Sequence, residues 1–447
     1  MTAIDRTCRD DGAQPTLAEL TRVFARIGCL SFGGPAGQIG MMHRSLVEEK
    51  RWISEERFLH ALNYCMLLPG PEAQQLATYI GWLVGGVRGG IVAGLLFILP
   101  GLFLMIGLSA AYAVWQETTW LNGLFFGLKA AVLVIVVEAV IRLGRKTLKT
   151  GFLRTVAALA FAALFFFGLP FPLVVLGAGL AGFVAARMGN VRDTPLVHPA
   201  DLPAKRRPLR AILLLLLWVA VWQAPLALLW VLDAPENLSA MFSFFSRMAL
   251  VTFGGAYAVL AYVAQVAVED YGWLQAGEMV DGLALAETTP GPLVLVLSFV
   301  GFLVGFRETS GAGAIAGGAL GAVLVAWATF VPSFIFIFVG APFIERLRGN
   351  VLMAAALSAI TAAVVGVIVN LSVWFGLHVL FTQVVRLPVA PSLGLTVSMP
   401  VFSSLDPAAV LLFVTAALLL FRFRLGMVPV LVFCAMAGLA LRLSGLG

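Results

Sequence analysis

Charged side chains are scarce in this chain of 447 residues. Asp, Glu, Lys and Arg make up 12% of the sequence, whereas hydrophobic residues make up 61%. Because a soluble domain carries about 25% charged residues, this chain cannot cover itself with a surface that suits water. We expect the lipid bilayer to be the solvent for most of its area. The net charge of +6 then indicates cytoplasmic loops rather than a nucleic-acid partner, since Lys and Arg gather in such loops.

Cysteine and histidine are equally rare, with four residues of each type. They are scattered along the chain, without a CxxC pair, as Cys8, Cys29, Cys65, Cys434, His43, His60, His198 and His378. This spacing supports neither a disulfide framework nor a zinc site, and we expect no metal and no cofactor. A membrane enzyme acting on a lipid phosphate would need clustered Asp, His or Arg residues. We therefore expect no enzyme activity, and the missing GxxxxGK[ST] loop argues against direct use of ATP.

Long apolar runs are abundant, and about 20 apolar residues span a hydrocarbon core. The runs are continuous, whereas strands of a membrane barrel alternate apolar and polar residues, so the sequence predicts an all-α integral membrane protein. The long runs are Ile91–Trp115, Leu121–Ile141, Ala211–Val231, Ala312–Gly340 and Val351–Leu377; the shorter ones are Thr155–Leu169, Phe171–Ala186, Pro407–Phe421 and Leu425–Leu441. The first residues, 1–15, are polar and do not resemble a secretory signal.

The sequence repeats itself at a constant offset of 221 residues. Phe32-Gly33-Gly34 aligns with Phe253-Gly254-Gly255, and Pro69-Gly70-Pro71 aligns with Pro290-Gly291-Pro292. Between these motifs Trp52 meets Trp273, and the alignment needs no gap over about 48 positions. Matching glycines alone would mean little in a chain with 46 of them. Matching both motifs and a tryptophan at one offset indicates a duplication.

The duplication predicts five parts of the chain. They are a cytoplasmic tail (1–15), an N-terminal transporter repeat (16–187), a basic cytoplasmic linker (188–210), a connecting transmembrane helix (211–231) and a C-terminal repeat (236–447). Charge predicts that the two repeats are inverted. The segment His43–Arg57 carries four Lys or Arg residues, whereas its counterpart Val268–Met279 carries none. The positive-inside rule therefore places the first inside and the second outside, and inverted repeats commonly surround a midplane binding site.

The two motifs interrupt segments that would otherwise be helical. Proline removes a backbone N–H and pushes the preceding residue from helical geometry, so we expect re-entrant half-helices that end and restart at FGG and PGP. Pro35, Pro71 and Pro292 suit the first position of a new helix. A broken helix offers an N-terminus with free N–H groups and partial positive charge, which attracts anions. The simpler alternative is a kink or a close helix crossing.

Ionisable residues near the motifs add to this hypothesis, because each is costly in lipid. Arg26 and Arg247 precede FGG by six residues in both copies. They either supply positive charge to a dianion or extend to the lipid headgroups. Glu72, directly after Pro71, and Glu287, shortly before Pro290, are the candidate carriers of a coupling ion. Glu72 has the alternative role of favouring the start of a helix. Thr289 completes the candidate binding residues, and the other candidates for a polar lining are Asn63, Gln74, Gln75 and Thr288.

At FGGPAGQIG (Phe32–Gly40), LPGPEAQQLATYIG (Leu68–Gly81), FGGAYAVL and ETTPGP, the sequence resembles the chromate ion transporter family in its long form with two fused domains. The resemblance implies export of chromate from a prokaryotic cytoplasm through the inner membrane, as a resistance function. Sulfate, a dianion of similar size and shape, is the competing substrate. It assigns the two FGG and two PGP motifs to the binding site, together with Pro35. Ala256 stands where Pro35 stands in the first copy, so the helix start there is less firmly predicted.

The hypothesis is a secondary transporter of an oxyanion that works by alternating access. Sulfate or other oxyanion uptake is the alternative of the same class. Neither the coupling ion nor the oligomeric state follows from the sequence, although a homodimer is possible. Export of a dianion is favoured by a negative-inside potential, at about 2.3 kcal/mol per charge per 100 mV.

Overall fold

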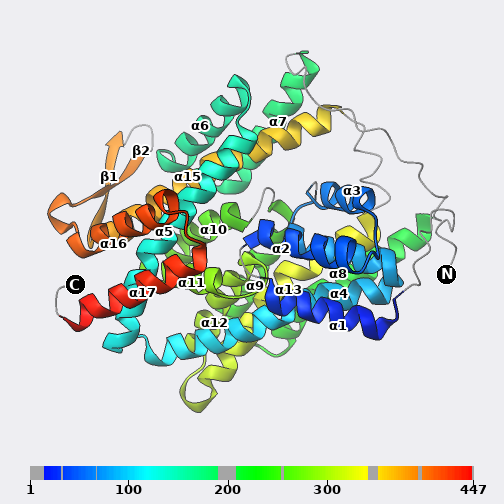
Figure 1. Cartoon of the computed structure of the whole chain (residues 1–447), viewed down its shortest axis with the longest axis horizontal. Helices are drawn as coiled ribbons and strands as arrows, with labels where there is room; N and C mark the ends of the chain where they lie inside the picture. Colours follow the sequence, from blue (N-terminus) through cyan, green and yellow to red (C-terminus); the bar gives the residue numbers. More distant parts are fainter. Residues whose placement is uncertain are drawn as a thin grey trace.

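The fold is that of a computed structural model, which describes residues 15–31, 34–66, 68–189, 208–252, 256–340, 351–390 and 395–444 (Figure 1). Helices form nearly all of it. In the first half they are α1 (Leu17–Leu30), α2 (Gly34–His43), η1 (Arg44–Glu49), α3 (Glu55–Cys65), α4 (Glu72–Trp115), α5 (Thr119–Thr147), α6 (Gly151–Phe165) and α7 (Phe171–Arg187). Helix α8 (Pro208–Val231) follows and contains the predicted connecting span.

The second half repeats this order of elements. They are α9 (Glu236–Val251), α10 (Ala256–Gln265), η2 (Val266–Asp270), α11 (Ala276–Thr288), η3 (Leu293–Leu295), α12 (Val296–Glu308), η4 (Gly311–Gly313), α13 (Ala314–Ile335), η5 (Phe336–Gly340), α15 (Val351–Leu380), η7 (Phe402–Ser404), α16 (Pro407–Ala417), η8 (Leu418–Arg422) and α17 (Met427–Leu443). An antiparallel hairpin, β1 (Val384–Ala390) and β2 (Leu395–Pro400), precedes η7 and was not predicted.

The apolar segments confirm a multi-pass helical membrane protein. Among the described residues, five helical segments are long and apolar enough to cross a bilayer, and four shorter apolar ones accompany them. These nine coincide with the nine apolar runs of the sequence. The bounds differ most at α4, which continues backwards from residue 91 to Glu72 through a kink at Gly85 and Gly86. In the second half, α12 and α13 are separate helices at this place.

Both PGP motifs separate helices, as predicted. Helix α3 ends at Cys65 and α4 begins at Glu72, with Pro71 in extended geometry at the N-cap. In the second copy α11 ends at Thr288, and Pro292 is the N-cap of η3. Each proline therefore stands one residue before the first helical position, where the missing N–H and the fixed φ are equally acceptable.

The hydrophobic cores cut across the two halves. One core joins α1, α3 and the beginning of α4 to Phe334, Ile337 and Phe338 at the end of α13. The other joins α9 to α13 with the end of α4 and with a bundle of α5, α6, α7, α15, α16 and α17. Figure 1 shows α1 to α4 with α8 on one side and this bundle on the other. Neither half buries its apolar faces by itself.

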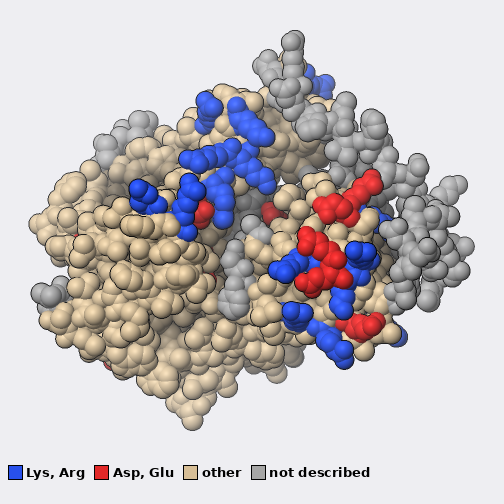
Figure 2. All heavy atoms as spheres, viewed as in Figure 1, with Lys and Arg blue, Asp and Glu red and all other residues tan. Residues whose placement is uncertain are grey.

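Charge is unevenly distributed over the surface. Figure 2 shows Lys and Arg spheres gathered in its upper part and mixed charges on the right, whereas the left end is almost uncharged. Five basic residues after the middle of α5, Arg142, Arg145, Lys146, Lys149 and Arg154, are exposed. The β1–β2 hairpin lies at the uncharged end (Figure 1).

Candidate functional site

Each PGP loop is bound to the helix break of the opposite half. The Gly70 N–H donates to the Thr252 carbonyl at 2.8 Å, and the Gly291 N–H donates to the Ser31 carbonyl at 2.9 Å. Ser31 and Thr252 are the last residues before the two FGG motifs and are themselves 221 positions apart. The four breaks therefore meet as two pairs, each made of one segment from either half. We call these two contacts the crossings.

Backbone geometry explains why glycine occupies both loops. Gly70 has φ +112° and Gly291 has φ +100°, in the region that L side chains rarely adopt. Neighbouring side chains also leave little space for a Cβ at either glycine. A Cβ on Gly70 would lie 2.9 Å from Gln75 Nε2 and 3.2 Å from Ser333 Oγ, and one on Gly291 would lie 3.0 Å from Leu295 Cδ1. A flanking proline on each side fixes the chain further.

The wall behind each loop also comes from the other half. Ser333 of α13 faces Gly70, while Gly101 of α4 lies against the second loop, where a Cβ would stand 2.4 Å from the Pro290 carbonyl oxygen. Gly28 of α1 is similarly close to α4, since its Cβ would meet the Leu96 carbonyl oxygen. These contacts leave room for backbone only. The loops are consequently rigid parts of the core, with Gly70, Pro71, Pro290, Gly291 and Pro292 buried.

Of the six predicted FGG residues, the structure describes Gly34. Phe32, Gly33, Phe253, Gly254 and Gly255 lie outside the described residues. Gly34 begins α2 with φ +70°, and Pro35 is the second residue of that helix. The predicted helix start after the first FGG is therefore present. Thr289 is buried, and its hydroxyl donates to the Ala286 carbonyl at 3.1 Å.

The sequence predicted that backbone N–H groups at the helix breaks bind an anion, but the crossings already use two of these groups. With the Gly70 and Gly291 N–H groups donated to carbonyls, the donors left at these breaks are the first-turn N–H groups of the new helices. They belong to Glu72 and Ala73 in α4 and to Leu293 and Val294 in η3. Any anion at the PGP breaks is thus expected at N–H groups that begin two residues after each glycine, at Glu72 and Leu293.

Three buried glutamines lie beside the crossings. Gln74 and Gln75 were predicted as part of a polar lining, whereas Gln38 was not. Gln38 Nε2 donates to the Gly291 carbonyl, and Gln75 Nε2 donates to the Pro69 carbonyl at 2.6 Å. Gln74 Nε2 donates to Thr78 Oγ1 at 3.2 Å. All three Oε1 atoms lack a partner within the described chain, and buried polar atoms normally have one. Gln74 and Gln75 belong to the LPGPEAQQ motif, so the sequence did contain the signal.

The two coupling candidates occupy different surroundings. Glu287 is buried and accepts a hydrogen bond from Tyr257 Oη at 2.7 Å, which links the end of α11 to the beginning of α10. Glu72 is half-buried in the first turn of α4. They are not equivalent positions, because the counterpart of Glu72 is Leu293 and that of Glu287 is Met66. Only Glu287 joins two broken segments of the same half.

The two predicted arginines are exposed. Arg26 lies on the outer side of α1. Arg247 donates through Nε to the Ser243 carbonyl at 3.2 Å and lines a cavity of about 460 Å³ together with Tyr262, Asp270 and Tyr271. Arg247 is five residues before Thr252 and thus about 7.5 Å along the helix from the crossing. It therefore lines a cavity within about two helical turns of one crossing.

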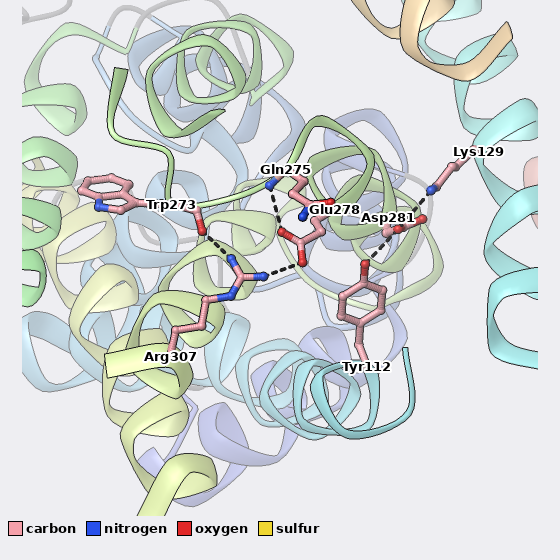
Figure 3. A network of polar contacts seen from close by, with 7 residues as sticks. All are labelled: Tyr112, Lys129, Trp273, Gln275, Glu278, Asp281 and Arg307. Carbon is pink, nitrogen blue, oxygen red and sulfur yellow. Dashed lines mark hydrogen bonds and ion pairs between the residues drawn. The ribbon is translucent and has the colours of Figure 1, made fainter. Parts of the chain in front are cut away.

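A second polar network lies on α11 (Figure 3). Asp281 Oδ2 accepts from Tyr112 Oη at 2.9 Å and pairs with Lys129 Nζ at 3.2 Å. One turn earlier, Glu278 pairs with Arg307, which also donates to the Trp273 carbonyl. Lys129 is conspicuous in the sequence as a cation inside an apolar run, but its partner is 152 positions away. Local spacing could not reveal this pair.

Comparison with known proteins gives a consistent result. The family model described as chromate transporter matches residues 18–183 and again residues 239–439. A chromate transport protein of Pseudomonas aeruginosa is 34% identical over 348 residues, covering 77% of each chain. A probable chromate transport protein of Synechococcus elongatus is 30% identical over 365 residues, covering 81% of this chain and 85% of the relative.

A third relative, a chromate transport protein of Cupriavidus metallidurans, is 31% identical over 354 residues, which cover 79% of this chain and 81% of the relative. No solved structure matches the chain. The matched ranges include both pairs of FGG and PGP motifs.

Proposed function

The chain belongs to the chromate transporter family, and from this premise we propose that it is a secondary transporter that carries chromate out of a prokaryotic cytoplasm through the inner membrane. The dianion binds near the midplane, where the broken helices meet. The observation that carries this proposal is the pair of crossings, Gly70 to Thr252 and Gly291 to Ser31. They bring helix starts from both halves together beside buried amide groups.

Helix starts suit a tetrahedral oxyanion. Each carries roughly half a positive charge and free N–H donors, so the starts of α4 and η3 can offset part of a dianion's charge. The glutamine side chains add neutral hydrogen-bonding groups. Arg26 and Arg247 are exposed, so we assign them to attraction of the anion rather than to direct binding. A site without a buried guanidinium also releases its ion more readily, which transport requires.

The crossings suggest how alternating access operates. If the two repeats are inverted, as their loop charges predict, each crossing joins equivalent points of two oppositely oriented units. The hydrogen bonds of Gly70 and Gly291 then lie where one repeat rocks against the other. The buried loops serve as the pivot, while the outer helices move.

Glu72 and Glu287 are our candidates for coupling. A carboxylate at Glu72 lies beside the first-turn N–H groups of α4 and repels a dianion there unless it is protonated. Leu293 offers no such charge at the equivalent place. Binding of the dianion at the start of α4 therefore favours protonation of Glu72. At the second PGP loop, Glu287, with its hydrogen bond from Tyr257, is the candidate for the same role.

Uptake into inverted membrane vesicles tests the function. We expect concentrative uptake of labelled chromate that sulfate inhibits. Gly291→Leu should abolish this uptake, because the new side chain would be too close to Leu295 and residue 291 has a φ that L residues rarely adopt. Gly107→Leu is the matched control, since a Cβ on Gly107 meets nothing within 4 Å. Uptake of neither anion by inserted wild-type protein would remove the chromate assignment. Uptake of sulfate alone would favour the other oxyanion transporter.

Cysteine labelling tests the inverted arrangement. Single cysteines within 43–57 and within 268–279 are expected to react from opposite sides of the membrane. A background without the four natural cysteines avoids interference. Reaction of both from one side would contradict the inversion, and crosslinking of the same proteins would reveal the possible homodimer.

A further inference from the structure

Helix α11 carries a buried acid that is held by two other helices. Asp281 is 5% exposed. Its Oδ2 receives the Tyr112 hydroxyl of α4 and lies 3.2 Å from Lys129 Nζ of α5, so three segments distant in the sequence meet at one carboxylate (Figure 3). We call Tyr112, Lys129 and Asp281 the carboxylate triad. Two aromatic rings, Phe125 and Phe299, pack on Tyr112 and enclose it.

Such a triad is costly as a purely structural device. Charges at membrane depth are expensive and are usually found at ion pathways or proton relays. Well-packed apolar residues often give equal or better stability than a buried ion pair. Lys129 lies in α5, whose surrounding sequence is otherwise apolar, and its side chain is 24% exposed. The triad is therefore a candidate for a functional role.

One atom of the triad is left open. Asp281 Oδ1 is buried and has no hydrogen-bond partner among the described residues, although a carboxylate oxygen so placed normally has one. Oδ2 is occupied by Tyr112 and Lys129, so Oδ1 is the oxygen on which a proton can bind. Binding converts the carboxylate to the acid and leaves Lys129 as an ammonium without its counter-ion.

The groups around Asp281 provide a path to the surface. On its own helix Glu278 lies one turn earlier, and from α12 Arg307 pairs with it. From α5 and α4 the facing groups are Lys129 and Tyr112. The Arg307 side chain is 41% exposed, so the Glu278–Arg307 pair reaches the surface near the end of α12. A proton can thus approach Asp281 along one turn of α11.

The same helix leads directly to the second PGP loop. Asp281 and Glu287 are six residues apart, about 9 Å along the helix. The helix ends at Thr288, and the segment Thr289-Pro290-Gly291-Pro292 comes next. The ion pair with Lys129 ties α11 to α5. Protonation of Asp281 loosens this tie and allows α11, together with the loop at its end, to shift against α5.

We propose that the carboxylate triad is a proton-binding site, distinct from the oxyanion site, through which α11 couples proton movement to transport. The inference rests on the proposed oxyanion transport. The ligand is the proton itself, taken from the aqueous side reached through Glu278 and Arg307 and released on the other side after α11 has moved.

The test uses full-length protein in liposomes that contain a pH-sensitive dye, with two readouts. The first is exchange of labelled for unlabelled chromate across the membrane, and the second is proton movement driven by a chromate gradient. We expect Asp281→Asn to retain exchange within about two-fold while proton movement falls at least about ten-fold, since the amide keeps the Tyr112 hydrogen bond but binds no proton. Glu56→Gln, at an exposed carboxylate on α3 outside the proposed proton path, is the matched control and should retain both.

The double variant Lys129→Gln/Asp281→Asn covers the case in which Asp281→Asn fails to fold, because it removes both charges together. It should also exchange chromate without moving protons. Proton movement that persists in a folded, exchanging variant would overturn the proposal, as would equal loss in Glu56→Gln. Wild-type protein that exchanges chromate without protons would overturn the triad's role alone. Absence of exchange in the wild type would instead overturn the proposed function.

Discussion

The two PGP loops have nearly the same backbone and very different surroundings. Their central glycines differ by 12° in φ, +112° against +100°, and both donate to the residue before the opposite FGG. Gln75 donates a hydrogen bond to the first loop, whereas Val296 occupies the equivalent position in the second half. Glu72 follows the first loop directly, whereas Leu293 follows the second. Backbone geometry is what the two copies share. Their ionisable groups have diverged, so the halves are expected to contribute differently to coupling.

The preceding helices differ even more. Helix α11 buries Glu278, Asp281 and Glu287, whereas α3 has exposed Arg57 and half-buried His60 at the places of the first two. In the second half, the helix that precedes the PGP loop thus has buried acidic residues. Four substitutions that would break or sharpen this contrast follow from the largest expected effect to the smallest.

Lys129→Gln should have the largest effect on stability. It leaves Asp281 buried without a counter-ion, and breaking a buried pair in this way costs about 3–5 kcal/mol. Thermal unfolding in detergent measures the loss. Arg57→Gln, at an exposed side chain of α3, is the control and should stay within about 0.5 kcal/mol of the wild type. Equal unfolding temperatures for the two variants would mean that α11 is no more dependent on its charges than α3.

Gly101→Ser tests the wall behind the second loop. Ser333 of α13 faces the first PGP loop as Gly101 of α4 faces the second, so the second half has a serine where the first half has a glycine. At Gly101 the added Cβ meets the Pro290 carbonyl oxygen. Overpacking costs about 1–3 kcal/mol, and because the opposing atom is backbone we expect chromate transport to fall at least about ten-fold. Gly107→Ser should transport normally, and comparable loss there would refute the close contact as the cause.

Gln75→Val makes the first loop resemble the second. The Pro69 carbonyl loses the hydrogen bond from Nε2, which is worth about 1 kcal/mol, and Val brings the side chain of the second copy. We expect a small loss of stability and a several-fold reduction of transport, measured in the same vesicles. A variant that behaves like the wild type would indicate that neither PGP loop needs a hydrogen bond from a side chain.

Ser333→Gly, the reverse exchange, should have the smallest effect. It removes a side chain 3.5 Å from Gln75 Nε2 and opens a little space beside Gly70. We expect transport within about two-fold of the wild type, because the contact is long for a hydrogen bond. A loss as large as that of Gly101→Ser would show that the two walls are interchangeable in importance.

Sequence reasoning predicted the membrane class, the nine apolar segments and the helix breaks at PGP, because apolar length and proline geometry act locally. It did not predict that Gly70 meets Thr252 or that Lys129 meets Asp281, since both contacts join residues more than 150 positions apart. The β1–β2 hairpin was also missed, because its residues lie in a loop read only for charge. Gln38, Gln74 and Gln75 were visible within the motifs, but their donation to loop carbonyls depends on tertiary packing.

The reciprocal crossings also bear on how the protein is made. When the ribosome has finished the first half, the Gly70 N–H has no Thr252 carbonyl to bind and Ser31 has no Gly291. An unsatisfied backbone group in hydrocarbon costs several kcal/mol, so the first loop must wait in a hydrated or otherwise protected state. We therefore expect both loops to assemble late, after the second half has inserted, and a chain truncated after α8 to lack both crossings.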